Sequence, residues 1–191
     1  MILTSATMLM PSPPQSGCTL WLTGLPGAGK TVLARSVAAR LRAMGRRVEL
    51  LDGSELRALD ARAGRPRGFT RTDRDEHVRH MGWVARALSR NGVFVVAAAV
   101  SPYRDARGWC RAQAGRFVEV HVDTPLHLCA ARDRTGLYRR AFAGEIEHFT
   151  GVNDPYETPE RPELRVTPDL TDDARVEAVI AALHAAAALP S

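Results

Sequence analysis

Residues 18–31 read CTLWLTGLPGAGKT, and this stretch decides the fold. Residues 18–23 form a short apolar run, which predicts a buried strand. Gly24 to Thr31 then fits the pattern G-x-x-x-x-G-K-[ST] in full. Residues 31–45 follow with apolar positions at helical spacing, and Gly45 is a signal for the end of a helix. A strand, a glycine-rich loop and a helix in this order are typical of a loop that binds phosphate groups.

The residue types in this loop suit a nucleoside triphosphate. Glycines let the backbone N–H groups point at the phosphates, and the helix N-terminus adds a positive dipole. Lys30 is expected to reach the β- and γ-phosphates, and the Thr31 hydroxyl to bind Mg²⁺. The predicted ATP-binding residues of the loop are Gly24, Leu25, Pro26, Gly27, Ala28, Gly29, Lys30, Thr31 and Val32.

Lys30 is the only lysine in a chain that has 25 arginines. An ammonium group is a compact charge on a long stem, whereas a guanidinium group is a planar fork. We expect a closed loop around a triphosphate to have room for the ammonium group but not for the guanidinium group. The lone lysine therefore indicates that this position is under functional constraint.

Beyond the loop, strand and helix patterns alternate to the end of the chain. Further strands are expected within residues 47–53, 93–101, 116–123 and 163–166. Further helices are expected in a short piece after residue 53 and at about 73–92, 105–115, 125–133 and 172–188, with Asp73 as the N-cap of the second of these. This alternation predicts an α/β fold with five parallel strands flanked by helices and joined by right-handed crossovers.

The 191 residues suit a single domain, which we place at residues 18–191 after a disordered leader at 1–17. The leader lacks Lys and Arg before its apolar part and contains Pro11, Pro13 and Pro14, so we do not expect a signal peptide. No apolar run approaches the roughly 20 residues that span a bilayer, and we expect no membrane association.

The net charge of +5 does not point to nucleic acid, because the arginines are scattered and aromatic residues make up only 6%. A basic surface also suits small polyanions such as nucleotides. Cys18, Cys110 and Cys129 lack the spacing of metal ligands, and we expect reduced thiols in a cytoplasmic protein.

Several stretches beyond the loop resemble the adenylylsulfate (APS) kinase family, in the same order along residues 19–187. They are LDG with Arg57 downstream, GFTRTDR (68–74), VSPYRDAR (100–107), FVEVHVDTPLHLCAARD (117–133), GLYRRAFAGEI (136–146) and FTGVNDPYETPERPEL (149–164). The resemblance implies a P-loop kinase fold with a mobile lid and a homodimer. It also implies transfer of the ATP γ-phosphoryl group to the 3′-hydroxyl of APS, which gives PAPS and ADP with the help of Mg²⁺.

The resemblance assigns roles to residues far from the loop. Lys30, Asp52 and Ser101 would be catalytic, and Asp52 would also contact the Mg²⁺ shell. Arg132, together with Asp133, would begin the lid over ATP. The residues expected to bind the acceptor are Asp52, Ser54, Arg57, Phe69, Arg74, His77, Val78, Ser101, Thr135, Gly136 and Leu137.

Five of these residues also have a purely structural interpretation. Asp52 could cap a turn with Gly53, and Phe69 could belong to the core. Arg57 and Arg74 could be surface charges. Ser101 could be the N-cap of a helix that begins after Pro102.

The chain departs from the family pattern mainly on the acceptor side. Ser54 stands where the family has a second carboxylate, a candidate general base, and His77, Arg79 and His80 replace an Asn and an Arg pair. In the lid, Thr135 replaces a lysine, for which Arg134 could substitute, and Phe142 replaces an arginine. His77 or Asp52 could serve as the base, although phosphoryl transfer depends mainly on positioning and electrostatics.

These departures leave three hypotheses. The first is an APS kinase with a drifted acceptor site. The second is a related enzyme that phosphorylates another hydroxylated or nucleotide-like metabolite. The third is a nucleotide-binding pseudokinase that does not transfer phosphate.

Overall fold

The computed structural model describes residues 17–189, so the predicted leader lies outside the described residues except for Gly17. The strands in this range are β1 (Cys18–Thr23), β2 (Val48–Asp52), β3 (Phe94–Ala98), β4 (Phe117–Val122) and β5 (Leu164–Val166). The helices are α1 (Lys30–Ala43), α2 (Gly53–Arg62), α3 (Arg71–Ser89), α4 (Arg104–Gln113), α5 (Leu126–Ala131), α6 (Leu137–Phe142) and α7 (Asp172–Ala185).

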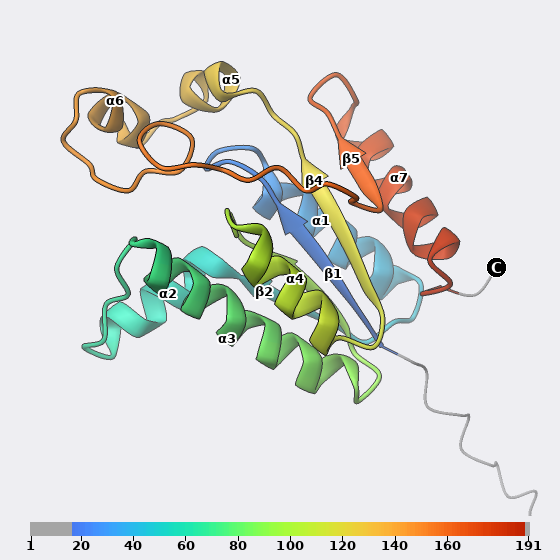
Figure 1. Ribbon diagram of the computed structural model, residues 1–191. Coiled ribbons are helices and arrows are strands. Elements are labelled where there is room, and N and C mark those ends of the chain that lie inside the picture. Colours follow the sequence, from blue (N-terminus) through green and yellow to red (C-terminus); the bar gives the residue numbers. More distant parts are fainter. Residues whose placement is uncertain (1–16, 190–191) are drawn as a thin grey trace, which may run out of the picture.

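The strands form one parallel sheet in the order β2-β3-β1-β4-β5, which confirms the predicted five-stranded α/β fold. Helices α1 and α7 cover one face of the sheet, and α3 and α4 cover the other (Figure 1). Along β1, Leu20 and Leu22 pack in the first core, whereas Trp21 packs in the second. Because both faces are covered, β1 reads as a continuous apolar run.

Parallel strands end at the same edge of the sheet, and here that edge gathers the predicted site residues. The phosphate loop follows β1, Asp52 ends β2, and Ser101 follows β3. Leu22 and Asp52 both pair with Ala98 of β3, so the ends of these three strands lie side by side.

The prediction that Asp73 is an N-cap is wrong, because α3 begins earlier and is capped by Thr70. The Thr70 hydroxyl accepts a hydrogen bond from the Asp73 N–H, and the Asp73 carboxylate accepts one from the Thr70 N–H at 3.1 Å. This reciprocal arrangement is a capping box, in which the acidic residue takes the third helical position.

Within residues 17–189, no helix is both long and apolar enough to cross a membrane. Cys18, Cys110 and Cys129 are all free and buried. Burial raises the pKa of Cys18 and of Cys110 to about 12, so both stay as thiols at neutral pH.

Candidate functional site

The phosphate loop runs from β1 into α1 and is shaped by its glycines. A side chain at Gly24 would place its Cβ 2.5 Å from the carbonyl oxygen of Val122, so only glycine fits there. Gly29 adopts a φ of +98° at the N-cap of α1, which a side chain would strain. The loop therefore lies directly against the end of β4 and leads into a helix N-terminus.

The Lys30 side chain is buried against the loop that carries it. Its Nζ donates to the carbonyl oxygens of Gly24 at 2.9 Å and of Leu25 at 2.8 Å. Burial lowers the pKa of Lys30 to about 8, although the nearby Asp52 carboxylate acts in the opposite direction. The ammonium group is thus charged at neutral pH.

Asp52, at the end of β2, contacts Thr31, the residue whose hydroxyl is expected to bind Mg²⁺. Its Oδ2 accepts a hydrogen bond from the Thr31 hydroxyl at 2.6 Å, and its Oδ1 accepts one from the Ser54 N–H at 2.8 Å and one from the Ser54 hydroxyl. Burial pushes the pKa of Asp52 upward, but these hydrogen bonds outweigh it and the net shift is downward. Asp52 also caps α2, so its structural role and its place beside Thr31 coexist.

A cavity of about 420 Å³ opens beside Lys30, Thr31 and Asp52. Nine of the eleven predicted acceptor residues line it, namely Asp52, Ser54, Arg57, Phe69, Arg74, His77, Val78, Ser101 and Leu137. A further wall is made of Ile146, Glu147, His148 and Phe149, which were not among the predicted acceptor residues. We call this space the acceptor cavity.

Phe69 contacts two arginines at this cavity. The guanidinium carbons of Arg57 and Arg74 lie 4.9 Å and 5.2 Å from the centre of its ring. Phe69 remains 52% exposed and is not a core residue. Burial, helped by the nearby Arg74 and Arg67, lowers the pKa of Arg57 to about 10, which still leaves it charged at neutral pH.

Arg74 is buried and joins segments that are far apart in the sequence. Its Nε donates to the carbonyl oxygen of Phe69 at 3.0 Å, and its Nη2 donates to that of His148 at 2.6 Å. The Asp154 carboxylate oxygen Oδ2 lies 3.7 Å from the Nε of Arg74. Arg74 therefore fixes two walls of the acceptor cavity relative to each other, which a surface charge would not do.

His77 is buried in the wall formed by α3. Burial, together with the positive charges of Arg57 and Arg67, lowers the pKa of His77 to about 4. Its imidazole is therefore neutral at physiological pH.

Ser101 lies between β3 and α4 with a φ of +40°, in the left-handed region. It is not the helix cap, because the N-cap of α4 is Tyr103. Its hydroxyl oxygen accepts a hydrogen bond from Trp21 Nε1 at 3.0 Å, and its carbonyl oxygen accepts one from Arg107 Nη1 at 2.6 Å.

A second cavity, of about 430 Å³, lies on the other side of the phosphate loop, and we call it the donor cavity. It contains the predicted residues Gly27, Ala28, Gly29, Val32 and Arg132, and Gly27 lines both cavities. Helix α7 adds Asp172, Arg175 and Val176, which sequence analysis missed because they lie about 140 residues downstream of the loop.

The predicted lid contains a helix, α6, that the sequence patterns did not reveal. Tyr138 of α6 is buried, and its hydroxyl donates to the carbonyl oxygen of Pro26 in the phosphate loop at 2.8 Å. Asp133 accepts hydrogen bonds from the Thr135 N–H at 2.9 Å and the Tyr138 N–H at 2.8 Å. Thr135 and Gly136 are not among the residues that line the acceptor cavity, so the structure does not place them where the sequence predicted.

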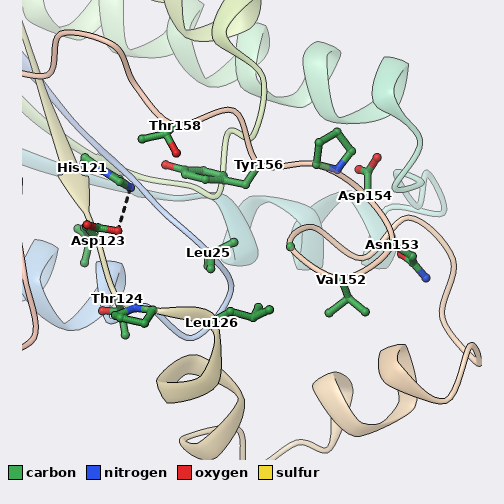
Figure 2. A pocket seen from close by; sticks show the side chains of 14 residues that line it. Leu25, His121, Asp123, Thr124, Leu126, Val152, Asn153, Asp154, Tyr156 and Thr158 are labelled. Atoms are coloured by element: carbon green, nitrogen blue, oxygen red, sulfur yellow. Dashed lines mark ion pairs between the residues drawn. The ribbon is translucent and has the colours of Figure 1, made fainter.

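A third hollow, of about 670 Å³, lies between the end of β4 and residues 151–158 (Figure 2). The rings of His121 and Tyr156 stack there with their centres 5.8 Å apart, and His121 Nε2 lies 3.8 Å from Asp123. Of the residues predicted for the site, it includes only Leu25. In the described part of the chain, no group of His, Cys, Asp and Glu could by itself hold a metal ion.

Comparison with known proteins agrees with this geometry. The sequence model of the family described as Adenylylsulphate kinase matches residues 16–167. The adenylyl-sulfate kinase of Synechococcus sp. (strain JA-3-3Ab) is 53% identical over 148 residues, which are 78% of this chain and 82% of that protein. The adenylyl-sulfate kinase of Rippkaea orientalis is 48% identical over 156 residues, or 82% and 84% of the two chains.

A solved structure is similar over nearly the whole described chain. It is the APS kinase CysC of Mycobacterium tuberculosis in complex with AMPPNP and APS, with a TM-score of 0.83 and 43% identity. The match covers 90% of this chain and 99% of the other. The chain therefore belongs to the adenylylsulphate kinase family, and it is an ATP-dependent kinase that acts on a hydroxyl group.

Proposed function

We propose that this kinase transfers the γ-phosphoryl group of ATP to the 3′-hydroxyl of APS, which produces PAPS and ADP. The observation that carries the proposal is the position of the phosphate loop between two cavities. Gly27 lines both of them, and nine predicted acceptor residues line one. A donor phosphate held on the loop would thus face an acceptor held in the acceptor cavity.

On the donor side, the loop N–H groups and Lys30 would hold the ATP phosphates. Lys30 would exchange its two bonds to loop carbonyls for the β- and γ-phosphate oxygens. Arg132 and Val32 line the donor cavity, where the rest of the nucleotide would lie. Tyr138 ties the lid helix to the loop, which would help to exclude water from the phosphates.

Thr31 and Asp52 fit a Mg²⁺ site. A hydroxyl and an ionised carboxylate 2.6 Å apart supply the hard oxygen ligands that Mg²⁺ prefers. When bound, the ion would neutralise negative charge on the transferring phosphoryl group. Asp52 would hold it directly or through a water.

On the acceptor side, Arg57 would contact the phosphosulfate, and the exposed ring of Phe69 would stack on adenine. Arg74 uses two of its N–H groups to hold Phe69 and His148, so it would mainly keep these walls in place. Both candidate bases are weak, because hydrogen bonds lower the pKa of Asp52 below its ordinary value and burial lowers that of His77 to about 4. Asp52 differs from His77 in carrying a negative charge next to Thr31. We assign Asp52 the larger role in orienting the acceptor hydroxyl, because phosphoryl transfer depends mainly on positioning and electrostatics.

The positions of the departures from the family pattern favour APS over another acceptor. His80 and Phe142 are exposed, and neither they nor Thr135 and Arg134 line the acceptor cavity. Ser54 and His77 do line it. The Ser54 hydroxyl donates a hydrogen bond to the Asp52 carboxylate, so it supports the carboxylate that is present. Most of the changed charges therefore would not touch the acceptor.

The experiment is to incubate the protein with Mg-ATP and APS and to follow ADP and PAPS together. Equal amounts of both would support the proposal. ATP binding without turnover of APS would refute it, and a panel of hydroxylated metabolites would then separate the remaining two hypotheses. Turnover of another acceptor favours the related enzyme, and no turnover on any acceptor favours the pseudokinase.

We also propose a homodimer located in the cytoplasm. The family resemblance suggests the dimer, and the three buried free thiols agree with a reducing compartment. Light scattering of the purified chain would give its mass, and a monomeric mass would contradict the first part of the proposal.

A further inference from the structure

Ser101 has a backbone conformation that serine rarely adopts. Its φ of +40° lies in the left-handed region, its side chain is buried, and it borders the acceptor cavity. Such a conformation is unfavourable for a residue with a β-carbon and persists only when the surroundings enforce it. The contacts of Ser101 identify what enforces it here.

Arg107 holds the Ser101 backbone through a hydrogen bond to its carbonyl oxygen. Its three donors go to the Ser101 carbonyl oxygen at 2.6 Å, the Glu157 carbonyl oxygen at 2.7 Å and the Glu119 carboxylate at 2.8 Å. Arg107 is only 3% exposed. The Ser101 carbonyl is thereby tied both to β4 and to the segment after the lid.

A second chain of hydrogen bonds fixes the residue before Ser101. The Thr23 hydroxyl donates to the Val100 carbonyl oxygen at 2.8 Å. Since this uses its single hydrogen, the Tyr156 hydroxyl, 3.0 Å away, is the donor in their mutual bond. Tyr156 is the residue that stacks on His121 in Figure 2.

Trp21 donates a hydrogen bond to the hydroxyl oxygen of Ser101. Its indole Nε1 can only donate, so the Ser101 oxygen accepts in the 3.0 Å bond and one of its lone pairs is occupied. In the described structure, the protein acceptor in reach of the Ser101 O–H is the Ala99 carbonyl oxygen at 3.4 Å. A substrate oxygen at ordinary distance would make a better partner than this long bond.

We propose that Trp21 is a positioning residue for phosphoryl transfer, because its indole N–H turns the Ser101 O–H toward the acceptor cavity. The inference rests on the proposed function, since it takes Ser101 to face the transferring group. Trp21 would act through Ser101 and would not touch the substrate. Its 0% exposure and its stacking on Phe117, with ring centres 6.0 Å apart, keep the indole in one orientation.

The test is Trp21→Phe, which retains an aromatic ring against Phe117 and removes the N–H donor together with part of the indole ring. Loss of one neutral hydrogen bond predicts a roughly three- to tenfold fall in kcat. The KM for ATP should not change, because the donor cavity does not include Trp21 or Ser101. Trp83→Phe is the matched control, since Trp83 is 62% exposed on α3 and should leave kcat unchanged.

A double-mutant cycle with Ser101→Ala separates positioning from packing. If Trp21 acts through Ser101, adding Trp21→Phe to Ser101→Ala should not lower kcat further. An equal loss in both backgrounds, or full activity of Ser101→Ala, would overturn the inference.

A crystal structure of Trp21→Phe gives an answer that needs no turnover. The Ser101 hydroxyl should leave its wild-type rotamer or occupy more than one. An unchanged single rotamer would overturn the inference even if the wild-type protein phosphorylates APS. Conversely, absence of PAPS from the wild-type protein would refute the proposed function without deciding the Ser101 geometry.

Discussion

The Thr31 hydroxyl donates a 2.6 Å hydrogen bond to Asp52 Oδ2, which joins the phosphate loop to the end of β2. These residues are 21 positions apart and meet because β1 and β2 end at the same edge of the sheet. The pair places an ionised carboxylate next to the loop that would hold the ATP phosphates.

Asp52→Asn should lower kcat by roughly 10- to 100-fold, because it removes the ionised partner of Thr31 while keeping the shape of the side chain. The concentration of Mg²⁺ needed for half-maximal activity should also rise. Ser54→Ala is the control, because it removes one donor to Asp52 but leaves the carboxylate in place. Equal activity of Asp52→Asn and wild type at low Mg²⁺ would contradict the proposed role.

Lys30→Arg should abolish transfer. The Lys30 side chain is buried and its Nζ fits between two loop carbonyls, which leaves little room for a planar guanidinium. Steady-state kinetics with saturating Mg-ATP would measure the loss. A kcat near that of the wild type would refute our explanation of why the chain keeps one lysine.

ATP binding should weaken as the pH rises above about 8. Burial lowers the pKa of Lys30 to about 8, so the ammonium is protonated below that pH and loses its charge above it. If binding needs the charged form, Kd should rise by up to roughly tenfold per pH unit above 8 and stay flat below it. Calorimetry with a non-hydrolysable ATP analogue at pH 7 to 9.5 gives Kd, and a flat profile throughout would exclude this linkage.

His77 should make the protein sensitive to acid. The pKa of His77 is lowered to about 4 in the fold and returns to about 6.5 when the chain unfolds. The unfolded state therefore binds more protons between these values, and stability falls as the pH drops from 6.5 to 4, by roughly 3 kcal/mol. Urea unfolding at several pH values would show this.

In His77→Asn, the free energy of unfolding should fall less steeply across this pH window. The difference in slope should correspond to about one fewer proton taken up on unfolding. Asn is the residue that the family pattern has at this position, so the variant should also keep its turnover of APS. An identical pH dependence of unfolding in the two proteins would show that His77 is not the group responsible.

Tyr138→Phe should loosen the lid. The hydroxyl that it removes donates to the Pro26 carbonyl oxygen, and this is a direct link from α6 to the phosphate loop. A looser lid admits water, so ADP formed without acceptor should increase several-fold relative to PAPS formation. Phe142→Leu, at an exposed position of the same helix, should leave the ratio of ADP to PAPS at one.

The sequence was sufficient for the fold and for most of the acceptor cavity. Strands covered on both faces read as apolar runs, and the loop pattern carries its own local geometry. The places of His148 in the acceptor cavity and of Arg175 in the donor cavity could not be predicted, because no local sequence motif marks either residue. Each reaches a cavity only through the packing of segments after the lid and of α7.

Thr135 shows that a match to a family position does not by itself place a side chain in the cavity. Its position in the family pattern predicted contact with the acceptor, but its N–H and hydroxyl both bond to Asp133. Ser54 stands where the family pattern has a second carboxylate, and its hydroxyl donates to the carboxylate of Asp52. Substitutions at matched positions therefore need geometry before they indicate a new substrate.

We propose that the two cavities on either side of Gly27 bring ATP and APS together for transfer. The most direct measurement is the yield of PAPS and ADP from Mg-ATP and APS, with Lys30→Arg as the negative control. We expect equal yields from the wild-type protein and none from the variant. ATP binding by the wild-type protein without any PAPS would contradict it.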